Sequence, residues 1–401
     1  MKLIIKRLFQ KIGLDISRYA PNIYDSTFIS IAPKGNVKGN VLLSYRVEPF
    51  LLKPDEKIPN SHTNYWESFQ ISKTFLDMGF IVDVIDYRNR SFIPGKNYSI
   101  FVGARTNFER LVKSLNPECI NIVHLDTAHW LFNNYASYAR AIALQRRRGV
   151  TIKTMKLVEP NLAIEYADCA TILGNKFTIG TYTYIHKPIY RIPISTCNTY
   201  PWPEDKDYHS SRKNYLWFGS EGLVHKGLDL VLEAFAEMPD YHLYICGPIK
   251  HERDFEMAYH KELYQTPNIH TIGWVNTDSP EFIKIAKNCV GIVYPSCSEG
   301  QAGAVIQCMH AGLIPIVSYE SGIDVDSKSG IVLEESSITE IRKAVQAIST
   351  LSSETLKGMS RQVWEYVRQN HTRERFAAEY KRVITHILET TKKAEHRTNI
   401  I

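Results

Sequence analysis

Short apolar runs alternate with longer stretches in which apolar residues recur every three or four positions. A short apolar run bounded by turn residues predicts a buried strand, and a period near 3.6 predicts an amphipathic helix. In the first half of the chain, the predicted strands are residues 41–45, 80–87, 99–103, 121–125 and 169–173. The predicted helices between them are residues 65–78, 106–114, 130–147 and 161–166.

The alternation stops near Ile194 and begins again after a polar segment, residues 195–213, that holds two prolines and several charges. The strands predicted beyond it are residues 215–218, 242–246, 270–272, 290–294 and 314–318. The predicted helices are residues 228–237, 281–287, 304–311 and 338–349, and the chain beyond Ser353 is helical in character.

Strands alternating with helices indicate a parallel sheet covered on both faces. The sequence therefore predicts an α/β protein with two doubly wound, Rossmann-like domains that face each other across a cleft. We assign residues 21–194 to the first domain, 195–213 to a linker and 214–371 to the second domain, with a helix at about 372–391 returning to the first. Ligands bind such folds at the carboxyl ends of the strands.

Residues 1–20 show helical spacing of their own. Ile5, Leu8, Ile12 and Ile16 form an apolar stripe, and Lys2, Lys6, Arg7, Lys11 and Arg18 supply positive charge. A basic amphipathic helix can lie on an anionic membrane surface. Packing on the first domain is the equally weighted alternative.

Composition and charge narrow the function classes. The 401 residues carry a net charge of +6 without a long basic stripe, which argues against a nucleic-acid binder. No apolar run reaches the ~18 residues that cross a bilayer. The seven cysteines include no C-x-x-C pair, so neither a disulfide framework nor a zinc site is expected. These features predict a cytoplasmic protein.

The chemistry concentrates in residues 294–317, where a strand is predicted to end at Tyr294 and a helix to begin near Gly303. Gly300 and Gly303 allow close approach of a ligand, and the helix start favours an anion such as pyrophosphate. Glu299 stands beside it as an acceptor for hydroxyl groups, with Gln307 one turn into the helix. A strand–helix turn with no ligand is the alternative.

A second loop, residues 219–227, follows the strand at 215–218 and carries Lys226 at the start of a helix. An ammonium at this place can meet phosphate oxygens. Two such loops at strand ends of one domain predict a shared anionic ligand.

These motifs resemble the nucleotide-sugar-binding domain of GT-B glycosyltransferases, in particular the retaining glycosyltransferase family 4. The matching stretches are Trp217-Phe-Gly, His225-Lys-Gly-Leu-Asp-Leu, Tyr244-Ile-Cys-Gly-Pro, Ile272-Gly-Trp-Val and Pro295-Ser-Cys-Ser-Glu-Gly. The resemblance covers residues 214–385, and the first half is similar only at residues 121–124 and 166–175.

The resemblance implies a role for each motif. Glu299 would hold the donor sugar, the backbone of Gly300, Gln301, Ala302 and Gly303 would meet sugar and pyrophosphate, and His124 would face the sugar from the first domain. Lys226, with Gly219, Ser220 and Gly222 nearby, would bind the diphosphate, and Trp274 and Val275 would lie beside the base. No metal ion is expected.

Three positions depart from the family pattern. Gln307 replaces the second of two glutamates, so Gln307→Glu is expected to be tolerated. The basic residue usual before the Lys-Gly pair is absent, and residues 219–222 (Gly-Ser-Glu-Gly) occupy its place. Residues 59–65 stand where a glycine-rich loop is usual.

Three further clusters have less specific patterns. Asp324-Val-Asp326 has the form of a metal–diphosphate motif, but such triplets arise easily by chance. His124 and His129 flank Asp126, which fits a hydrogen-bonded histidine better than a metal site. Arg146-Arg147-Arg148 is expected to be a solvated helix end, with binding of acceptor phosphate as the second interpretation.

The expected function is transfer of a sugar (a hexosyltransferase-type reaction, EC 2.4) from a nucleotide-diphosphate donor to an acceptor hydroxyl. Synthesis of a cell-surface polysaccharide or glycolipid at the inner membrane face would suit the charged first 18 residues. The alternatives are a non-catalytic sugar-nucleotide-binding scaffold and a GT-B sugar-nucleotide epimerase.

Overall fold

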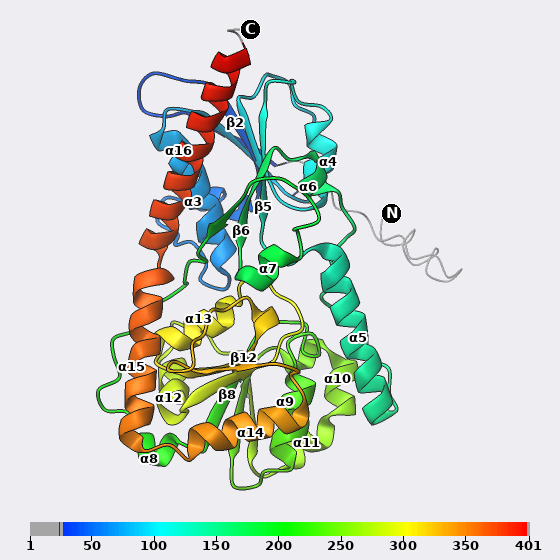
Figure 1. Cartoon of the computed structure of the whole chain (residues 1–401), viewed down its shortest axis with the longest axis vertical. Coiled ribbons are helices and arrows are strands. Elements are labelled where there is room, and N and C mark those ends of the chain that lie inside the picture. The colour runs from blue at the N-terminus through cyan, green and yellow to red at the C-terminus, as the bar shows by residue number, and fades with distance from the viewer. Residues whose placement is uncertain (1–23, 25–26, 399–401) are drawn as a thin grey trace, which may run out of the picture.

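The computed structural model describes Tyr24 and residues 27–398, which form two α/β domains stacked along the long axis of the molecule (Figure 1). The amphipathic helix expected at residues 1–20 lies outside the described residues. Within the described part of the chain, no helix is both long and apolar enough to cross a membrane.

The first domain is built on a seven-stranded sheet in the order β1-β3-β2-β4-β5-β6-β7. Its strands are β1 (Phe28–Ile31), β2 (Asn40–Tyr45), β3 (Ile81–Asp86), β4 (Ile100–Gly103), β5 (Ile120–Leu125), β6 (Cys169–Leu173) and β7 (Ile189–Ile192). Only β1 is antiparallel to its neighbour. The five predicted strands are confirmed. The two that were missed, β1 and β7, lie at the edges of the sheet and have only four residues each, too few for a clear periodic pattern.

Helices cover both faces of this sheet. They are α3 (Thr63–Asp77), α4 (Thr106–Val112), α5 (Trp130–Arg148), α6 (Ala163–Tyr166) and α7 (Lys176–Gly180), and a short 3-10 helix spans Glu48–Phe50. The buried side chains of α3 pack with one face of the sheet, and Phe108 and Ile164 of α4 and α6 pack with the other.

The second domain holds a fully parallel six-stranded sheet in the order β10-β9-β8-β11-β12-β13. Its strands are β8 (Asn214–Phe218), β9 (His242–Cys246), β10 (Ile269–Gly273), β11 (Gly291–Tyr294), β12 (Ile314–Ser318) and β13 (Ile331–Leu333). The prediction missed only β13, a three-residue edge strand. Because the strand order reverses between β8 and β11, the ligand crevice of this sheet is expected beyond these two strands.

In the second domain the helices predicted at 228–237, 281–287, 304–311 and 338–349 are confirmed, and those at 208–211, 253–258 and 260–265 were not predicted. The helices of this domain are α8 (Tyr208–Ser211), α9 (Leu228–Ala236), α10 (Arg253–Ala258), α11 (His260–Gln265), α12 (Pro280–Asn288), α13 (Gly303–His310), α14 (Ile338–Ser349) and α15 (Ser353–Asn370), with 3-10 helices at Ile249–His251 and Tyr319–Ser321. The fold class predicted from the sequence, two doubly wound domains, is confirmed.

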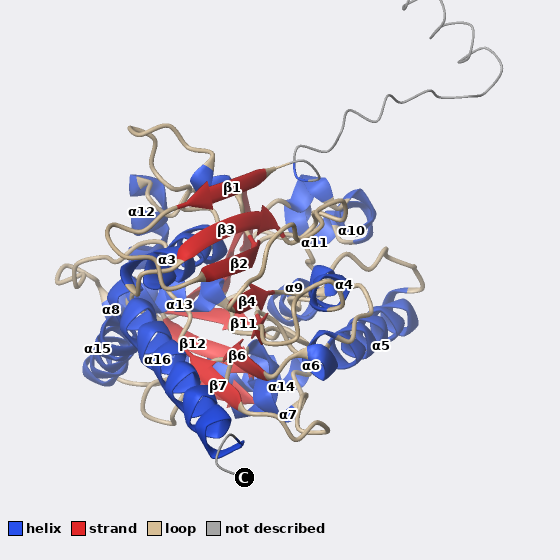
Figure 2. Cartoon of the chain, turned by 90° about the horizontal axis from the view of Figure 1, so that it is seen from above, coloured by secondary structure: helices blue, strands red, loops and turns tan. Residues whose placement is uncertain are grey.

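The chain ends in α16 (Arg373–Thr398), which leaves the second domain and runs along the first (Figures 1 and 2). Its Phe376 and Tyr380 stack on each other at 5.8 Å, and Tyr380 also meets Phe75 of α3 edge-on at 6.4 Å. Both aromatic rings are fully buried. This helix therefore completes the core of the first domain with the last part of the chain.

The segment at residues 195–213, assigned to a linker because of its polar composition, is buried at several positions. Ser195, Thr196, Tyr200 and Tyr208 are all buried. The backbone N–H and hydroxyl of Ser195 donate to Glu67 of α3 at 2.9 and 2.8 Å. The segment is polar because it threads between the two domains, where its polar groups find partners in both.

The arginines at the end of α5 are likewise not a solvated helix end. Figure 1 shows α5 running from the first domain down the flank of the second. Arg147 pairs with Asp229 and Glu233 of α9, and Arg148 pairs with Glu262. Of the three arginines, only Arg146 has no ion-pair partner among the described residues. Ion pairs of Arg147 and Arg148 therefore join α5 to the second domain.

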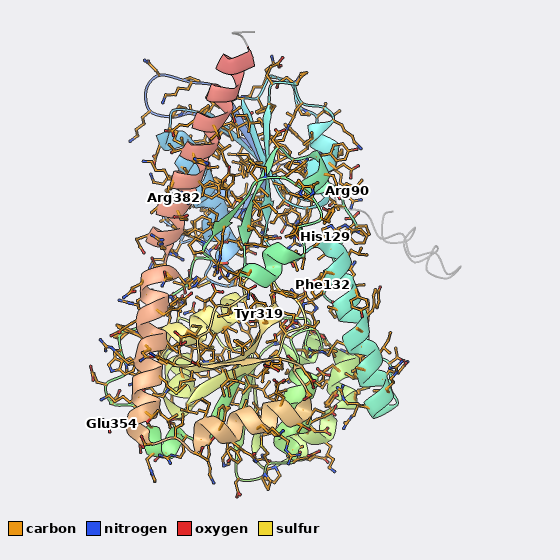
Figure 3. The ribbon with its side chains drawn as sticks, viewed as in Figure 1. Arg90, His129, Phe132, Tyr319, Glu354 and Arg382 are labelled. Atoms are coloured by element: carbon orange, nitrogen blue, oxygen red, sulfur yellow. The ribbon has the colours of Figure 1, made fainter. Side chains whose placement is uncertain are left out.

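Aromatic side chains continue this contact toward the middle of the molecule. Phe132 of α5 meets Phe177 at 5.1 Å, and Phe177 meets Tyr319 of the second domain at 5.7 Å. Figure 3 shows Phe132 and Tyr319 at the level where the two domains meet. The domains are thus joined on the α5 side of the molecule as well as through residues 195–213 and α16.

Candidate active site

A cleft of about 700 Å³ lies between the two domains at the carboxyl ends of their strands. The second domain lines it with residues from three of the predicted motifs: Gly219, Ser220, Lys226, Trp274, Val275, Glu299, Gln301, Ala302, Gly303 and Gln307. The first domain lines it with Tyr45, residues 59–64, Glu67, Arg105, Asp126 and Lys156, among others. The motifs that the sequence separates by some 80 positions therefore face one cavity.

Lys226 reaches this cleft because of the turn that follows β8. Gly227 caps the N-terminus of α9 with φ +74°, and a Cβ atom there would lie 2.5 Å from the carbonyl oxygen of Pro295. Only glycine suits both the left-handed backbone and the close approach. The indole N–H of Trp217 donates to the carbonyl of Lys226 at 3.3 Å. These contacts hold Lys226, whose side chain is 6% exposed.

Glu299, which follows β11, forms an ion pair with Lys226 at 3.0 Å. The same carboxylate oxygen, Oε1, accepts from the hydroxyl of Tyr294 at 2.9 Å. Its other oxygen, Oε2, has no partner among the described residues. Burial by itself raises the pKa of Glu299, but Lys226, His225 and Lys156 outweigh it and lower the pKa to about 2. Glu299 is therefore ionised and has one oxygen available for a ligand.

The predicted helix start is confirmed, since α13 begins at Gly303 with Ala302 as its N-cap. Gly303, Ala302 and Gln301 line the cleft. The side-chain oxygen of Gln301 accepts from the backbone N–H of Ile194 at 2.8 Å, and its buried Nε2 has no partner among the described residues. Free N–H groups at a helix start favour an anion, as expected for this turn.

Gly300 is placed differently from the expectation that its backbone meets the ligand. It does not line the cleft, and a Cβ atom at Gly300 would lie 2.4 Å from the backbone oxygen of Asp126 in the first domain. Its own carbonyl accepts from the hydroxyl of Thr178 at 3.0 Å. Glycine is required here because two backbones from different domains touch.

Of the remaining residues predicted on the donor side, four line the cleft and one does not. Trp274, 58% exposed, and the buried Val275 line the cleft together with Gly219 and Ser220. Gly222 does not line it. Its backbone has φ +89°, and its N–H donates to the buried Glu252.

Gln307 lines the cleft, but its amide is already fully used. Its oxygen accepts from Thr196 at 3.2 Å and from the N–H of Asn198 at 3.1 Å. Its nitrogen donates to the carbonyl of Asn198 at 2.9 Å and to the hydroxyl of Tyr200 at 2.8 Å. A primary amide has two donor hydrogens and two acceptor lone pairs, so none is left for a second hydroxylated group. Gln307 binds the connecting segment instead.

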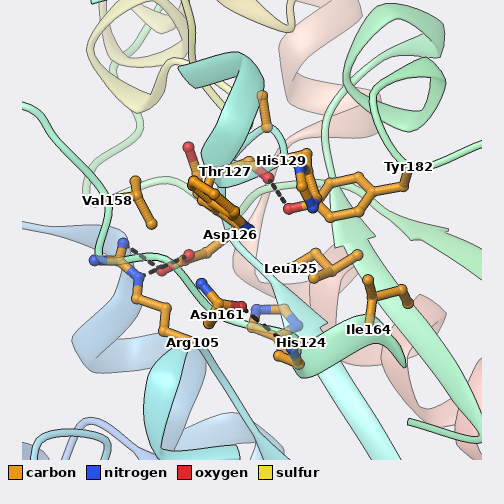
Figure 4. Close-up of a pocket in the computed structure, with 13 residues that line it drawn as sticks. Arg105, His124, Leu125, Asp126, Thr127, His129, Val158, Asn161, Ile164 and Tyr182 are labelled. Atoms are coloured by element: carbon orange, nitrogen blue, oxygen red, sulfur yellow. Dashed lines mark hydrogen bonds and ion pairs between the residues drawn. The ribbon is translucent and has the colours of Figure 1, made fainter. Parts of the chain in front are cut away.

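His124 is also placed differently from the expectation. It is 1% exposed and does not line the cleft; it lines a small cavity of about 20 Å³ behind it (Figure 4). Its Nδ1 lies 2.9 Å from the hydroxyl of Thr171, and its Nε2 has no partner among the described residues. Burial lowers its pKa to about 4, so the ring is neutral. The neighbouring Asp126 reaches the cleft wall instead, paired with Arg105 at 3.0 Å.

Several cleft residues of the first domain carried no sequence signal. Glu67 of α3 is fully buried, and burial raises its pKa to about 7 although hydrogen bonds from Ser195 oppose this. His62, at the N-cap of α3, has its pKa lowered to about 4 by burial. Lys156 comes from an irregular loop. None of these belongs to a recognisable motif, and only the helical phase of α3 placed Glu67 near apolar neighbours.

The side chains of the two possible metal sites named from the sequence have partners within the protein. Asp324 pairs with Arg191 of β7, and His129 caps the N-terminus of α5. Among the described residues, no group of three or more His, Cys, Asp or Glu side chains is arranged to hold a metal ion.

Residues 204–369 match the family model described as "Glycosyl transferases group 1". This range includes Lys226, Glu299 and the three cleft-lining segments of the second domain. The second domain therefore matches this family over most of its length. No curated protein is similar enough in sequence to be matched.

Solved structures of the GT-B fold share the two-domain architecture of this chain. Sucrose-phosphate synthase from Thermosynechococcus elongatus is 13% identical with a TM-score of 0.63, over 88% of this chain and 99% of that one. Anabaena HepE in complex with UDP-glucose is 12% identical with a TM-score of 0.55, over 88% of this chain and all of that one. WaaG, a glycosyltransferase involved in lipopolysaccharide biosynthesis, is 14% identical with a TM-score of 0.51, over 85% and 98%. At these identities the likeness concerns the fold. The chain spans only 54% of a longer match, S. aureus TarM.

Proposed function

We propose that this protein is a glycosyltransferase that moves a sugar from a nucleoside-diphosphate sugar to an acceptor hydroxyl, with retention of the anomeric configuration. The observation that carries the proposal is the Lys226–Glu299 pair, at 3.0 Å. The two residues follow β8 and β11, the strands between which the order of the second sheet reverses, and they face the first domain across the cleft.

Lys226 would bind the diphosphate. An ammonium has three N–H donors, and Glu299 takes only one of them in the described structure. The other two can meet phosphate oxygens, and the start of α13 adds its positive dipole. Together these groups would stabilise the charge that develops on the diphosphate as the bond to the sugar breaks.

Glu299 would hold the sugar, since Oε2 is free to accept from one of its hydroxyl groups. Trp274 presents an exposed ring at the cleft, which suits contact with the base. In a retaining transfer on one face of the sugar, the leaving diphosphate takes the proton of the acceptor hydroxyl while the acceptor oxygen bonds to the anomeric carbon. The protein then mainly positions the reactants.

The group that faces the sugar from the first domain is Asp126 in this proposal, in place of His124. Burial raises the pKa of Asp126, but Arg105 outweighs it and keeps the carboxyl ionised. A fixed negative charge at the cleft wall would stabilise positive charge on the sugar ring. The neutral His124 would support the wall from behind.

We further propose that transfer needs no metal ion, because protein cations and the α13 dipole neutralise the diphosphate. Activity is expected to be unchanged in excess EDTA. Loss of activity in EDTA that added Mg²⁺ or Mn²⁺ restores would contradict this.

The acceptor is proposed to be a saccharide or lipid-linked saccharide at the cytoplasmic face of a membrane, in polysaccharide or glycolipid synthesis. The five basic residues among positions 1–18 support attraction to anionic lipid. A second support is a stripe along one face of α5, Leu131, Tyr135, Tyr138 and Ile142, each 47–70% exposed.

Co-sedimentation with anionic vesicles tests this location. Binding is expected to fall with salt and to weaken both on deletion of residues 1–18 and in Tyr135→Ser/Ile142→Ser. If the full-length protein does not bind anionic vesicles at low salt, the membrane proposal is wrong.

A panel of UDP-, GDP- and ADP-sugars with simple saccharide acceptors tests the reaction, UDP-glucose first because HepE, of the same fold, was solved with it. Mass spectrometry of nucleotide and glycan products distinguishes the outcomes. Glycosylated acceptor supports transfer, and an altered nucleotide sugar or free sugar without acceptor indicates an epimerase. Donor binding without any product indicates a non-catalytic scaffold.

Two variants connect the reaction to the site. Lys226→Ala and Glu299→Gln should each lower kcat/KM by about 10- to 100-fold, the value of one charge-assisted contact. Lys226→Ala should also weaken binding of the bare diphosphate, whereas Glu299→Gln should mainly affect the sugar. Unchanged activity in both folded variants would contradict the assignment of Lys226 and Glu299 to the donor site.

A further inference from the structure

The loop between α5 and α6 crosses from the first domain to the donor side of the second. Two asparagines of α5 hold it in place. Asn133 donates to the carbonyl of Lys156 at 2.8 Å, and Asn134 exchanges two 2.8 Å hydrogen bonds with the backbone of Val158. On the other side, the N–H of Lys153 donates to Asp254 of the second domain at 2.6 Å. The backbone around Lys156 is thus fixed to both domains.

The side chain of Lys156 occupies the space above Gly222. A Cβ atom at Gly222 would lie 2.3 Å from Cγ of Lys156, and φ of Gly222 is +89°. Gly222 belongs to the Gly-Ser-Glu-Gly turn after β8, which contains no basic residue. This turn therefore makes room for a basic side chain that arrives from the first domain.

Lys156 and Lys226 line the same cleft, together with Glu299 and Ser220. Lys226 has Glu299 as its ion-pair partner, but no acidic side chain pairs with Lys156 in the described part of the chain. The pKa of Lys156 is lowered to about 8, first by Lys226 and then by burial. Glu299 and Glu221 act in the opposite direction, and Arg105 adds to the lowering. Two ammonium groups therefore lie close together on the donor side of the cleft, and only Lys226 has an acidic partner there.

We propose that Lys156 is a second ligand of the donor diphosphate, supplied by the first domain beside a turn of the second domain that has no basic residue of its own. The inference rests on the proposed nucleotide-sugar function and extends it. Because Lys226 comes from one domain and Lys156 from the other, bound diphosphate would bridge the two domains. A nucleoside without phosphates would not use Lys156.

Calorimetry with UDP, GDP and ADP tests the proposal. For whichever diphosphate the wild type binds, Lys156→Gln should weaken binding about 10- to 100-fold, the effect of one charge-assisted contact. Binding of the matching nucleoside should not change. Lys153→Gln is the matched control, because Lys153 lies on the same loop and only its backbone contacts Asp254. Equal diphosphate affinity in Lys156→Gln and wild type would overturn the proposal.

Two further variants separate a binding role from a structural one. Lys156→Arg should keep most of the affinity, which also covers the case in which Lys156→Gln does not fold. Ser220→Arg in the Lys156→Gln background should recover at least part of the affinity, because it returns a cation to the turn after β8. Failure of both Arg variants to bind better than Lys156→Gln would mean that Lys156 acts through the loop structure.

Proton uptake gives an independent measurement. Diphosphate should raise the pKa of Lys156, so binding at pH 8 should take up as much as about half a proton. Titrations in buffers of different ionisation enthalpy measure this uptake, which should disappear in Lys156→Arg. If the wild type binds none of the three diphosphates, the proposed function fails. If it binds one and only Lys226→Ala weakens it, the function stands and the role of Lys156 is wrong.

Discussion

The wall that the second domain contributes to the cleft comes from three short segments, each directly after a strand of one sheet. They contain Lys226, Trp274 and Glu299. The first domain builds its wall from side chains on different kinds of element, such as Glu67 within α3, Asp126 after β5 and Lys156 in a loop. A parallel sheet brings the ends of its strands together by itself, whereas the first wall depends on how separate elements pack. The four predictions below test this difference, from the largest expected effect to the smallest.

Gly300→Ala should have the largest effect, because the walls meet there. The added methyl group would overlap the backbone oxygen of Asp126 at 2.4 Å, so the loop carrying Glu299 or the opposite wall must move. A misplacement of about 1 Å can cost on the order of 100-fold in kcat/KM. Steady-state kinetics measure the loss. Gly358→Ala on α15, where no atom lies within 4 Å of the added methyl, is the control and should keep full activity.

Gln307→Glu should destabilise the protein, contrary to the tolerance expected from the sequence. A carboxylate cannot donate to the carbonyl of Asn198 or to Tyr200, and it would be buried at 4% exposure. We expect a loss of about 3 kcal/mol in the free energy of unfolding. Urea unfolding measures it against Gln346→Glu, an exposed position on α14. Equal stability of the two variants would show that Gln307 does not bind the connecting segment as described.

Glu67→Gln should stabilise the protein in a pH-dependent way. The pKa of Glu67 is about 7 in the folded state against 4.5 ordinarily, so the folded protein holds a proton that the unfolded chain has lost between these values. Wild-type stability therefore falls from pH 4.5 to 7, and the variant, which has no carboxyl group to ionise, avoids this loss. At pH 8 the gain should approach about 3 kcal/mol, and at pH 4 it should vanish. Glu335→Gln, at an exposed position, is the control for the substitution itself, and a gain at Glu67 that is constant with pH would contradict the assignment.

Arg147→Ala should have the smallest effect. Arg147 is a partly exposed member of the α5 contact, and after its loss Arg140 still acts on the buried Asp229. We expect about 1 kcal/mol lower stability with activity nearly unchanged. Arg146→Ala, one residue away and without an ion pair in the described structure, should cost less in the same thermal unfolding measurement. Equal losses of stability in the two variants would instead support the solvated helix end that the sequence predicted.

Much of the donor side was predictable because its information is local. A strand, a glycine turn and a helix start lie within about ten residues of one another, so the positions of Lys226, Glu299 and Gly303 followed from the order of residues alone. The helix start at Gly303 was predicted correctly, as were the strands of both sheet interiors. Edge strands such as β1, β7 and β13 were missed because each has only three or four residues, which is too short for a clear periodic pattern.

The partners of these residues were not predictable. The sequence suggests a ligand-binding or solvated role for Gln307, Gly300 and Arg147. In the structure each of them contacts the other domain or the connecting segment instead. His124 and Asp126 are two positions apart, and only the packing of β5 decides that the first is buried and the second reaches the cleft.

The sequence by itself determined two doubly wound domains and the residue types at the strand ends of the second, because apolar periodicity and glycine placement act within a few residues. The tertiary structure alone decided which polar groups stay free for a ligand. Hydrogen-bonding capacity is finite, and whether it is used depends on partners more than 100 positions away, such as Asn198 for Gln307. For the same reason, only the fold could place Lys156 beside Lys226, 70 residues further along the chain.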